Sequence, residues 1–563
     1  MEAKAPTPER PQPETVALPQ QTSTPALKPP LVPTPAPDMT KRAWLIASFV
    51  ILVLAIALRF SALELKPMHH DEGINGFFLT NLLRQGVYKY DPTNYHGPTL
   101  YYLTLPAVAL FGLSTFAVRF MTALFGVGIV WLALSLRRCV GAFGALAAAA
   151  LIAVSPSAIF YSRYFIHETM FVFFTLGLVV AALRFYETRA TTYLMLAAAS
   201  AGLLFATKET AFISVGTLVL AWLVARSRAT SAAAATKASP KRASTKRSAG
   251  EEEEEAASSS PLPWFFDTSQ PATQLGVWAL ARFLFINILF YSSFFTHWAG
   301  TVAALDSLKI WTKTGTSEFH GKPFGTYLTW LIQQEAPILA LAVVGSVVAL
   351  FERRANRFAV FAGAWAFGMF AAYSLIPYKT PWLVLNFAVP MAIIGGYAVQ
   401  VLGERSVAGP KGRARSLLVA GLAVAVCMYQ SAVLNFREYD NDQYPYVYTQ
   451  TQRETHALVN EVERLAERAG TKQIGVTITS SEHWPLPWYF RNNPRVGYTG
   501  SVSSSYNSQD VPIVIGRESA DSKEDQSAQL RAALGAEYKQ VGVYRLRPGV
   551  RLALFARRDL ANR

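Results

Sequence analysis

Long apolar runs alternate with short polar segments along most of the chain. The first run is "AWLIASFVILVLAIALRFSAL", and later runs approach the roughly 20 residues that an α-helix needs to cross a bilayer. Their approximate ranges are 98–113, 116–136, 142–160, 167–184, 192–207, 210–226, 277–295, 328–350, 358–376, 382–402 and 415–434. Hydrophobic residues make up 52% of the chain and charged residues 16%, whereas soluble domains carry about 25% charged residues. The pattern predicts a polytopic α-helical membrane protein.

Basic residues between the runs indicate the topology, because Lys and Arg concentrate in cytoplasmic loops. Lys41-Arg42 precede the first run and place the N-terminus inside. If every run crossed the membrane, the later basic loops would fall outside. Treating 98–113 as a short juxtamembrane or re-entrant helix leaves eleven spans and places all these loops inside: Arg137-Arg138, Arg184 and Arg189, the linker after 226, Arg353-Arg354, and Lys411 to Arg415. We therefore expect about eleven spans in the cell membrane and an external C-terminal part.

Three segments depart from the membrane pattern. Residues 1–40 are rich in Pro, Thr, Ala and Gln and predict a disordered tail. Residues 227–262 join a basic block to five glutamates and predict a disordered cytoplasmic linker. After residue 435 the composition becomes that of a soluble protein, with a helical period in "ETHALVNEVERLAERAG" and strand patterns in "KQIGVTI", "VPIVIG" and "YKQVGVYRL". These patterns predict an external α/β domain.

The predicted organisation therefore has five parts. A tail (1–40) precedes an N-terminal transmembrane catalytic module (41–226), whose first external loop covers 64–115. The linker (227–262), the C-terminal transmembrane helices (263–435) and the external α/β domain (436–563) follow.

Charge and cysteine content exclude some classes of function. The net charge of +15 lies largely in the short loops that set topology, and no basic face with interleaved aromatic residues is visible. We therefore expect no nucleic-acid binding. The chain has two cysteines, Cys139 and Cys427, both in or beside apolar runs. Such a pair excludes a disulfide framework and a cysteine-based zinc site.

The segment "MHHDEGINGFF", residues 68–78, is the first candidate for chemistry. Asp71 and Glu72 stand immediately after the first apolar run, where a charge is costly unless it is paired or used. His69 and His70 precede them and are either solvated loop residues or partners of Asp71. A function for the two acids is the favoured interpretation.

Further polar residues gather in the external loops of the predicted topology. Arg119 lies near a helix end and could instead extend its side chain to the lipid headgroups. Lys208 and Glu209 could instead be a pair of opposite charges that neutralise each other in a turn. The candidates for binding a donor phosphate or substrate are His96, Arg119, Arg163, His167, Glu168, Lys208, Glu209 and Lys379.

This mixture of groups fits one chemistry well, sugar transfer from a lipid-linked phosphosugar. A carboxylate can deprotonate an acceptor hydroxyl, and cations bind a phosphate. We expect Asp71 to be the general base with Glu72 in support, and Arg163 and Lys379 to contact the donor phosphate. Direct action of one carboxylate predicts inversion at the sugar carbon. Alternatively, His69 and His70 join Asp71 around a divalent cation such as Mg or Mn.

The same residues resemble a known group of proteins. Asp71-Glu72, His96-Gly97-Pro98, Arg119 and Arg163 resemble motifs of the lipid-phosphosugar glycosyltransferases of the C-type fold, which include the protein O-mannosyltransferases and the aminoarabinose transferase. The set is most similar to flippase activity-associated proteins, as are "PYKTPW" and "WPLPWYFR", so the resemblance covers about residues 44–500. The O-mannosyltransferases carry a Pro-Pro pair and an aspartate where this chain has "HGP" and "HE". The identity of the substrate therefore does not carry over.

Three functions remain as hypotheses. The leading one is a membrane glycosyltransferase that uses a polyprenyl-phosphate sugar donor and a glycan, lipid or protein acceptor. The second is a lipid-linked sugar flippase or a non-enzymatic flippase-associated protein, which should carry ionisable residues mid-membrane near broken helices. The third is a structural membrane protein with a ligand-binding external domain. Convergence of Asp71, Arg163 and Lys379 on one external cavity would favour the first.

Overall fold

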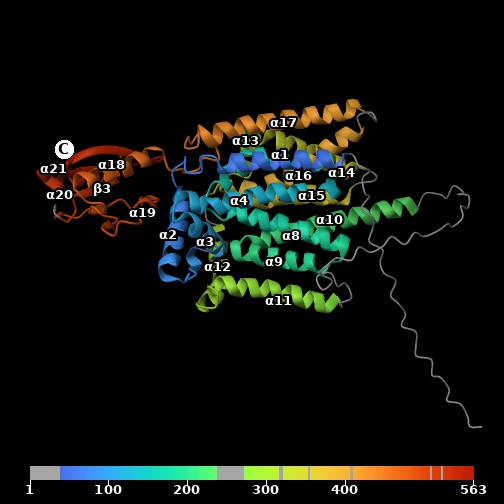
Figure 1. The fold of residues 1–563 in the computed structure, drawn as a ribbon, viewed down its shortest axis with the longest axis horizontal. Coiled ribbons are helices and arrows are strands. Elements are labelled where there is room, and N and C mark those ends of the chain that lie inside the picture. Colours follow the sequence, from blue (N-terminus) through green and yellow to red (C-terminus); the bar gives the residue numbers. More distant parts are fainter. Residues whose placement is uncertain are drawn as a thin grey trace, which may run out of the picture. The chain divides into compact units, whose positions relative to one another are not determined.

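The computed structural model combines apolar helices with a C-terminal mixed sheet (Figure 1). It describes residues 39–94, 96–237, 272–315, 321–352, 356–405, 410–507, 510–521 and 524–562. Three predictions lie wholly or largely outside these residues: the tail at 1–40, the linker at 227–262 and the loop with Arg353-Arg354.

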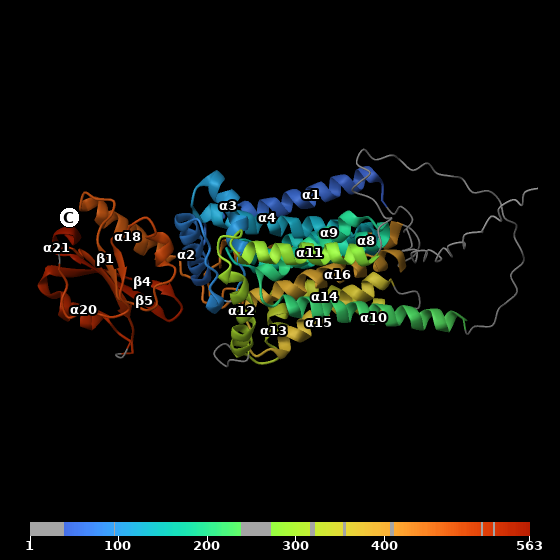
Figure 2. The same ribbon diagram turned by 90° about the horizontal axis from the view of Figure 1, so that it is seen from below.

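Eight helices of the described residues are long and apolar enough to cross a membrane. They run side by side in both views (Figures 1 and 2). α10 continues to Lys237, so the beginning of the predicted linker, with its run of alanines, is helical. The eight helices are α1 (Lys41–Phe60), α4 (Thr115–Leu134), α8 (Glu168–Thr188), α10 (Ala211–Lys237), α11 (Ala272–Tyr291), α15 (Arg357–Leu375), α16 (Leu385–Arg405) and α17 (Pro410–Phe436).

Two bent helix pairs raise the count to ten. α6 (Ala142–Val154) meets α7 (Pro156–Ser162) at 56°, and α13 (Thr326–Gln334) meets α14 (Ala336–Phe351) at 110°. The shorter α9 (Thr191–Thr207) packs against α8 and α11 and would bring the count to the predicted eleven.

The apolar run at 98–113 forms the short helix α3 (Thr99–Phe111). Its 13 residues reach about 20 Å, well short of the roughly 30 Å hydrocarbon core. This length agrees with its treatment as a juxtamembrane element. Which side of the membrane each loop occupies stays a prediction.

Glu335 joins the breaks of the two bent pairs. It is buried between α13 and α14, and its Oε1 accepts hydrogen bonds from Ser155 Oγ at 2.8 Å, Ser157 N at 2.9 Å and Ser157 Oγ at 2.6 Å. The carboxylate therefore caps the N-terminus of α7 from a segment far away in the sequence, where the helix dipole favours a negative charge.

Short elements between the long helices build the region around the candidate site. Pro98 N-caps α3, and Ser155 Oγ caps α7 by accepting from Ala158 N. The short elements around the site are α2 (His70–Gln85), the 3₁₀ helix η1 (Pro92–Asn94), α12 (Ala299–Gly315) and the 3₁₀ helix η4 (Pro381–Val384). α5 (Arg137–Val140) connects α4 to α6 and does not line the cavity.

The C-terminal residues form a five-stranded sheet with helices, which confirms the predicted α/β domain. The strands are β1 (Val476–Ile478), β2 (Val496–Tyr498), β3 (Ile513–Glu518), β4 (Tyr538–Arg547) and β5 (Val550–Arg557), in the order β2-β1-β3-β5-β4. β1 pairs in parallel with β2 and β3, while β5 is antiparallel to β3 and β4. All strands except β5 therefore point the same way, and their carboxyl ends lie at one edge.

The predicted helical period corresponds to α18 (Glu454–Arg468), whose apolar stripe of Leu458, Val462 and Leu465 packs in the core of this domain. The sheet supplies Ile478, Ile515 and Leu554 to the same core. Shorter helices complete the domain: α19 (Leu486–Tyr489), α20 (Ser527–Leu534), the 3₁₀ helix η5 (Gly535–Glu537) and α21 (Arg558–Ala561).

Candidate active site

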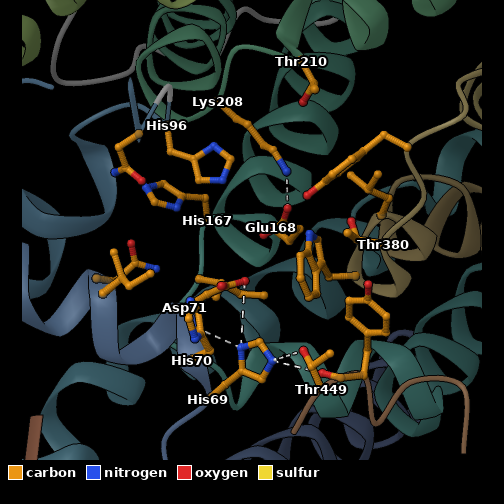
Figure 3. A pocket seen from close by; sticks show the side chains of 18 of the residues that line it. His69, His70, Asp71, His96, His167, Glu168, Lys208, Thr210, Thr380 and Thr449 are labelled. Carbon is orange, nitrogen blue, oxygen red and sulfur yellow. Dashed lines mark hydrogen bonds and ion pairs between the residues drawn. The ribbon is translucent and has the colours of Figure 1, made fainter. Parts of the chain in front are cut away.

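A cavity of about 570 Å³ lies where the external loops of the predicted topology meet the C-terminal residues. Its walls come from the start of α2, η1, the segments before α8 and α10, α12, the segment after α15, and residues beyond 440 (Figure 3). The predicted site residues that line it are His69, His70, Asp71, His96, His167, Glu168, Lys208 and Glu209. Segments that are far apart in the sequence therefore meet at this cavity.

Asp71 is presented to the cavity by the first turn of α2. His69 is the N-cap: its Nδ1 accepts from Asp71 N at 3.1 Å, and its own N–H donates to Glu72 Oε2 at 2.8 Å. This reciprocal arrangement is a capping box. The Asp71 side chain keeps 38% of its surface exposed, while those of His69 and Glu72 are buried. The cap thus turns the two adjacent acids in different directions.

Glu72 is held in a buried network with Arg119 and does not line the cavity. Arg119 Nε and NH2 each donate to one Glu72 oxygen at 2.7 Å. The remaining donations of Arg119 go to the carbonyls of Leu63, Lys66 and Pro67. All five N–H groups of a guanidinium are used in this way. Arg119 therefore fixes the segment between α1 and α2.

The predicted metal ligand His69 has both ring nitrogens engaged. Nδ1 accepts from the Asp71 backbone, so Nε2 carries the proton and donates to Tyr448 O at 3.0 Å. Neither nitrogen keeps a free lone pair for a cation. Within the described part of the chain, no group of three or more His, Cys, Asp or Glu residues is arranged to hold a metal ion. The residues around Asp71 do not fit a three-ligand metal site.

His70 faces the cavity and is bound by a residue that sequence reasoning missed. Arg547 NH1 donates to His70 Nδ1 at 2.9 Å, and Arg547 also pairs with Glu482. Burial together with the charge of Arg547 lowers the pKa of His70 to about 4 even though Asp71 opposes the shift. Because Arg547 lies 477 residues from His70 in the chain, no local signal could have linked the two residues.

The "HGP" motif brings the loop before α3 against the end of α9. Gly97 N donates to Thr207 O at 3.1 Å, and a Cβ at Gly97 would lie 2.1 Å from Ala206 O. Only glycine allows so close a backbone approach. His167 Nε2 donates to the Gly97 carbonyl at 3.1 Å. Burial and the nearby charges lower the pKa of His167 well below its usual value, so its ring is neutral.

Two ion pairs form the wall opposite Asp71. Lys208 is buried and pairs with Glu168, and His96 Nδ1 lies 3.0 Å from Glu209 Oε2. Figure 3 shows the Lys208 ammonium pointing to Glu168 beside the cavity. The cavity therefore contains a buried cation at a position that a bound anion can reach, on the opposite side from Asp71.

Two other predicted phosphate ligands, Arg163 and Lys379, do not line this cavity. Arg163 donates to the carbonyls of Leu58, Ser61 and Ala62 at the end of α1. Lys379 Nζ donates to Ile376 O at 2.6 Å. Both side chains support backbone segments next to the site, so only Asp71 of the expected convergent trio faces the cavity.

The C-terminal domain is attached to this region through the segment "WPLPWYFR". Tyr489 OH accepts from Met68 N at 2.9 Å, Trp488 Nε1 donates to Thr115 Oγ1 at 3.1 Å, and Arg491 NH2 donates to Leu113 O at 2.7 Å. The two glycines of "DEGING" make room for this contact. A Cβ at Gly73 would lie 2.7 Å from Pro485 Cβ, and one at Gly76 would lie 2.5 Å from Trp488 Cε3.

Comparisons with known proteins identify similar folds and one matching family model. Residues 95–238 match the family model described as dolichyl-phosphate-mannose-protein mannosyltransferase. ArnT from Cupriavidus metallidurans in the apo state is similar in structure, with a TM-score of 0.59 and 14% identity over 92% of this chain and 99% of that chain. The chain has a C-type glycosyltransferase fold. The fold predicted from the motifs is thus confirmed, including the multi-pass membrane part.

Two further structures are similar. ArnT from the same organism bound to undecaprenyl phosphate has a TM-score of 0.55 and 14% identity, with the same coverage. The Archaeoglobus fulgidus oligosaccharyltransferase in complex with Zn and sulfate has a TM-score of 0.47 and 14% identity over 84% of this chain and 68% of that one. A comparison with curated protein sequences finds no match.

Proposed function

We propose that this protein transfers a sugar from a polyprenyl-phosphate-linked donor to an acceptor hydroxyl on the external face of the membrane. One observation carries the proposal: of the four acids that line the cavity in the described chain, Asp71 alone has no cation or histidine within hydrogen-bond distance of its carboxylate. Glu168 pairs with Lys208, Glu209 with His96 and Glu482 with Arg547. His69 Nδ1 lies 3.9 Å from Asp71 Oδ2 and accepts the backbone N–H of Asp71 instead.

Asp71 is the general base of the proposed reaction. The acceptor oxygen attacks the sugar carbon that bears the phosphate, and its proton passes to the Asp71 carboxylate. The carbon–oxygen bond to the phosphate breaks, and the polyprenyl phosphate leaves with the electron pair. One direct displacement inverts the configuration at that carbon. A positioned base contributes about 10²–10⁴-fold to the rate.

Lys208 is the proposed partner of the donor phosphate. It is the buried cation on the wall opposite Asp71, and its ammonium already faces a carboxylate, that of Glu168. ArnT, which shares the fold, has been crystallised with undecaprenyl phosphate, and the matched family model is described as dolichyl-phosphate-mannose-protein mannosyltransferase. These relatives support a polyprenyl phosphate as the lipid carrier.

The flippase alternative is supported by one observation, the buried Glu335 at the meeting point of two broken helix pairs. Transporters place ionisable groups at such breaks. In this chain the bonds of Glu335 to Ser155 and Ser157 are those of a helix cap. Asp71, Glu168 and Lys208 line the cavity, whereas Glu335 does not. The transferase is therefore the better-supported function.

The deciding experiment is a turnover assay of the full chain in lipid nanodiscs with a panel of polyprenyl-phosphate sugars. Asp71→Asn keeps the shape of the side chain but loses its basicity and should lower turnover about 10²–10⁴-fold without weakening donor binding. The matched control is Asp91→Asn in the same external loop, where Asp91 only accepts from Thr93. Wild-type turnover in Asp71→Asn, or lipid-linked sugar translocation without transfer, would refute the proposal.

A further inference from the structure

The C-terminal domain supplies part of the cavity wall through the carboxyl ends of its strands. Glu482 follows β1, and Arg547 is the last residue of β4. In open α/β sheets, ligands bind in the crevice beyond the carboxyl ends, where consecutive connections leave a strand in opposite directions. Here the chain passes from β1 to β2 on one side and then to β3 on the other. The loop after β1 occupies that position.

Two rings of this loop, His483 and Trp484, form a row with His70 of α2 and Tyr498 of β2. This row of four rings is here called the aromatic track. The ring centroids of His70 and Trp484 are 6.5 Å apart, those of Trp484 and His483 are 5.7 Å apart, and those of His483 and Tyr498 are 4.8 Å apart. Tyr498 is 37% exposed at the carboxyl end of β2, and His70 lines the cavity. The track therefore connects the outer surface to the reaction site.

The track is fixed in place. His483 Nδ1 lies 3.0 Å from Ser480 O, and Trp484 packs beside Gly73 of α2. Arg547 and Glu482 form an ion pair at the inner end, against His70. The four rings are partly exposed and lie next to a planar cation and a carboxylate. This combination matches the two chemical sides of a sugar, which has apolar C–H groups on one face and hydroxyls around the rim.

We propose that the aromatic track is the docking surface for the acceptor, and that the acceptor is a carbohydrate chain. Sugar rings stack on Tyr498, His483 and Trp484, while Arg547 and Glu482 bind the hydroxyls of the last sugar. Its free hydroxyl is thereby directed into the cavity towards Asp71. This inference rests on the proposed transferase function and adds the class of acceptor.

A carbohydrate fits this surface better than a peptide. A peptide would add as a strand along the free edge of β2 or β4, where backbone groups are available for pairing. The aromatic track instead lies across the strand ends, and it leads to the cavity through loop side chains. The ligand would thus be bound through aromatic ring faces and charged side chains, not through backbone hydrogen bonds to a strand.

The test measures equilibrium binding of short neutral and acidic oligosaccharides to the full chain in nanodiscs, with no donor present. Tyr498→Ala should weaken binding about three- to tenfold, as expected for one lost stacking contact, and Tyr498→Phe should bind like the wild type. The matched control is Tyr429→Ala, which removes an exposed tyrosine of α17. Binding of a polyprenyl-phosphate sugar should be unchanged in all of these variants.

Failure of this inference is distinct from failure of the transferase proposal. Oligosaccharide binding that depends on Tyr498 supports the docking surface even if no donor turns over. The inference is overturned if the wild-type protein binds no oligosaccharide, or if it binds peptides at the aromatic track instead. The transferase proposal is then still tested separately by the donor turnover assay. Equal loss of binding in Tyr498→Ala and Tyr498→Phe would also overturn it, because stacking would not be the cause.

Discussion

Glu72 and Arg119 form a fully buried, two-point ion pair in which both contacts measure 2.7 Å. Asp71, the neighbour of Glu72 in the sequence, lies partly exposed in the cavity. The "DE" pair thus divides into a buried acid that is paired with Arg119 and a partly exposed acid that lines the cavity. Glu72 also accepts from Phe165 N at 2.8 Å, which connects the beginning of α2 to the segment before α8.

Removing Arg119 should destabilise the protein rather than change its chemistry directly. Arg119→Ala leaves the Glu72 charge buried and unpaired, which typically costs about 3–5 kcal/mol. We expect a clear fall in thermal stability, measured by unfolding of the protein in nanodiscs. Asp71→Asn should leave the same midpoint unchanged. Equal stability of Arg119→Ala and wild type would show that the pair contributes little.

Lys208 should matter for donor binding separately from its pairing with Glu168. Lys208→Gln should raise the KM for the polyprenyl-phosphate sugar about tenfold or more, corresponding to one charge-assisted contact of about 1.5–3 kcal/mol. The double variant Lys208→Gln, Glu168→Gln removes the unpaired acid and should recover stability without recovering KM. A double variant with wild-type KM would assign Lys208 a structural role only.

The contact between His70 and Arg547 should make stability depend on pH. Burial lowers the pKa of His70 from 6.5 to about 4, so between these values the unfolded chain binds a proton that the folded chain does not. The neutral His70 ring therefore contributes fully to the free energy of unfolding above about pH 6.5. This contribution decreases as the pH is lowered towards 4. The decrease is less than about 1.4 kcal/mol per pH unit because His70 is only partly buried.

The groups that face His70 are Asp71, His69, His483 and Arg547. Thermal unfolding of wild type and His70→Gln between pH 4 and 7 isolates the contribution of this ring. The difference in midpoint should shrink as the pH falls. A difference that grows on acidification would mean that the protonated ring is the one stabilised by folding.

Gly76 should control how the C-terminal domain attaches to α2. A methyl group at this position would lie 2.5 Å from the Trp488 ring, so Gly76→Ala should displace the "WPLPWYFR" segment. We expect faster proteolytic release of the C-terminal domain and lower turnover. Gly86→Ala on the same helix is not a matched control because Gly86 has a positive φ of 71°. Leu83→Ala, at an exposed position of the same helix, is the better comparison.

The predicted topology can be tested directly. With the N-terminus inside and eleven spans, a protease added to the cytoplasmic side should cut near residues 240–255 and spare residues 436–563. The same protease added to the external side should reach only the C-terminal domain and the external loops. Cleavage within 436–563 from the cytoplasmic side would contradict the eleven-span topology and the external location of the cavity.

Local sequence patterns are sufficient to predict the long helices, the short helix at 98–113 and the α/β character of the C-terminal domain. Each rests on a local period or length: apolar runs near bilayer thickness, a run too short to span, and strands with a helical stripe between them. The sequence also located Asp71, because an acid immediately after a membrane span requires a partner or a use. The segment "HHDE" contains the N-cap residue and the N3 glutamate of the capping box that begins α2. The role of His69 as the cap was not predicted.

Only the tertiary structure decided which polar side chains face the cavity. Arg163 and Lys208 both follow apolar runs, yet Arg163 donates to carbonyls at the end of α1 while Lys208 lines the cavity. The approach of Arg547 to His70 over 477 residues had no sequence signal. The physical reason is that a side chain's direction is set by the packing of its helix against distant segments. Periodicity fixes where a helix runs, whereas its neighbours fix which of its charges meet solvent, a backbone carbonyl or a substrate.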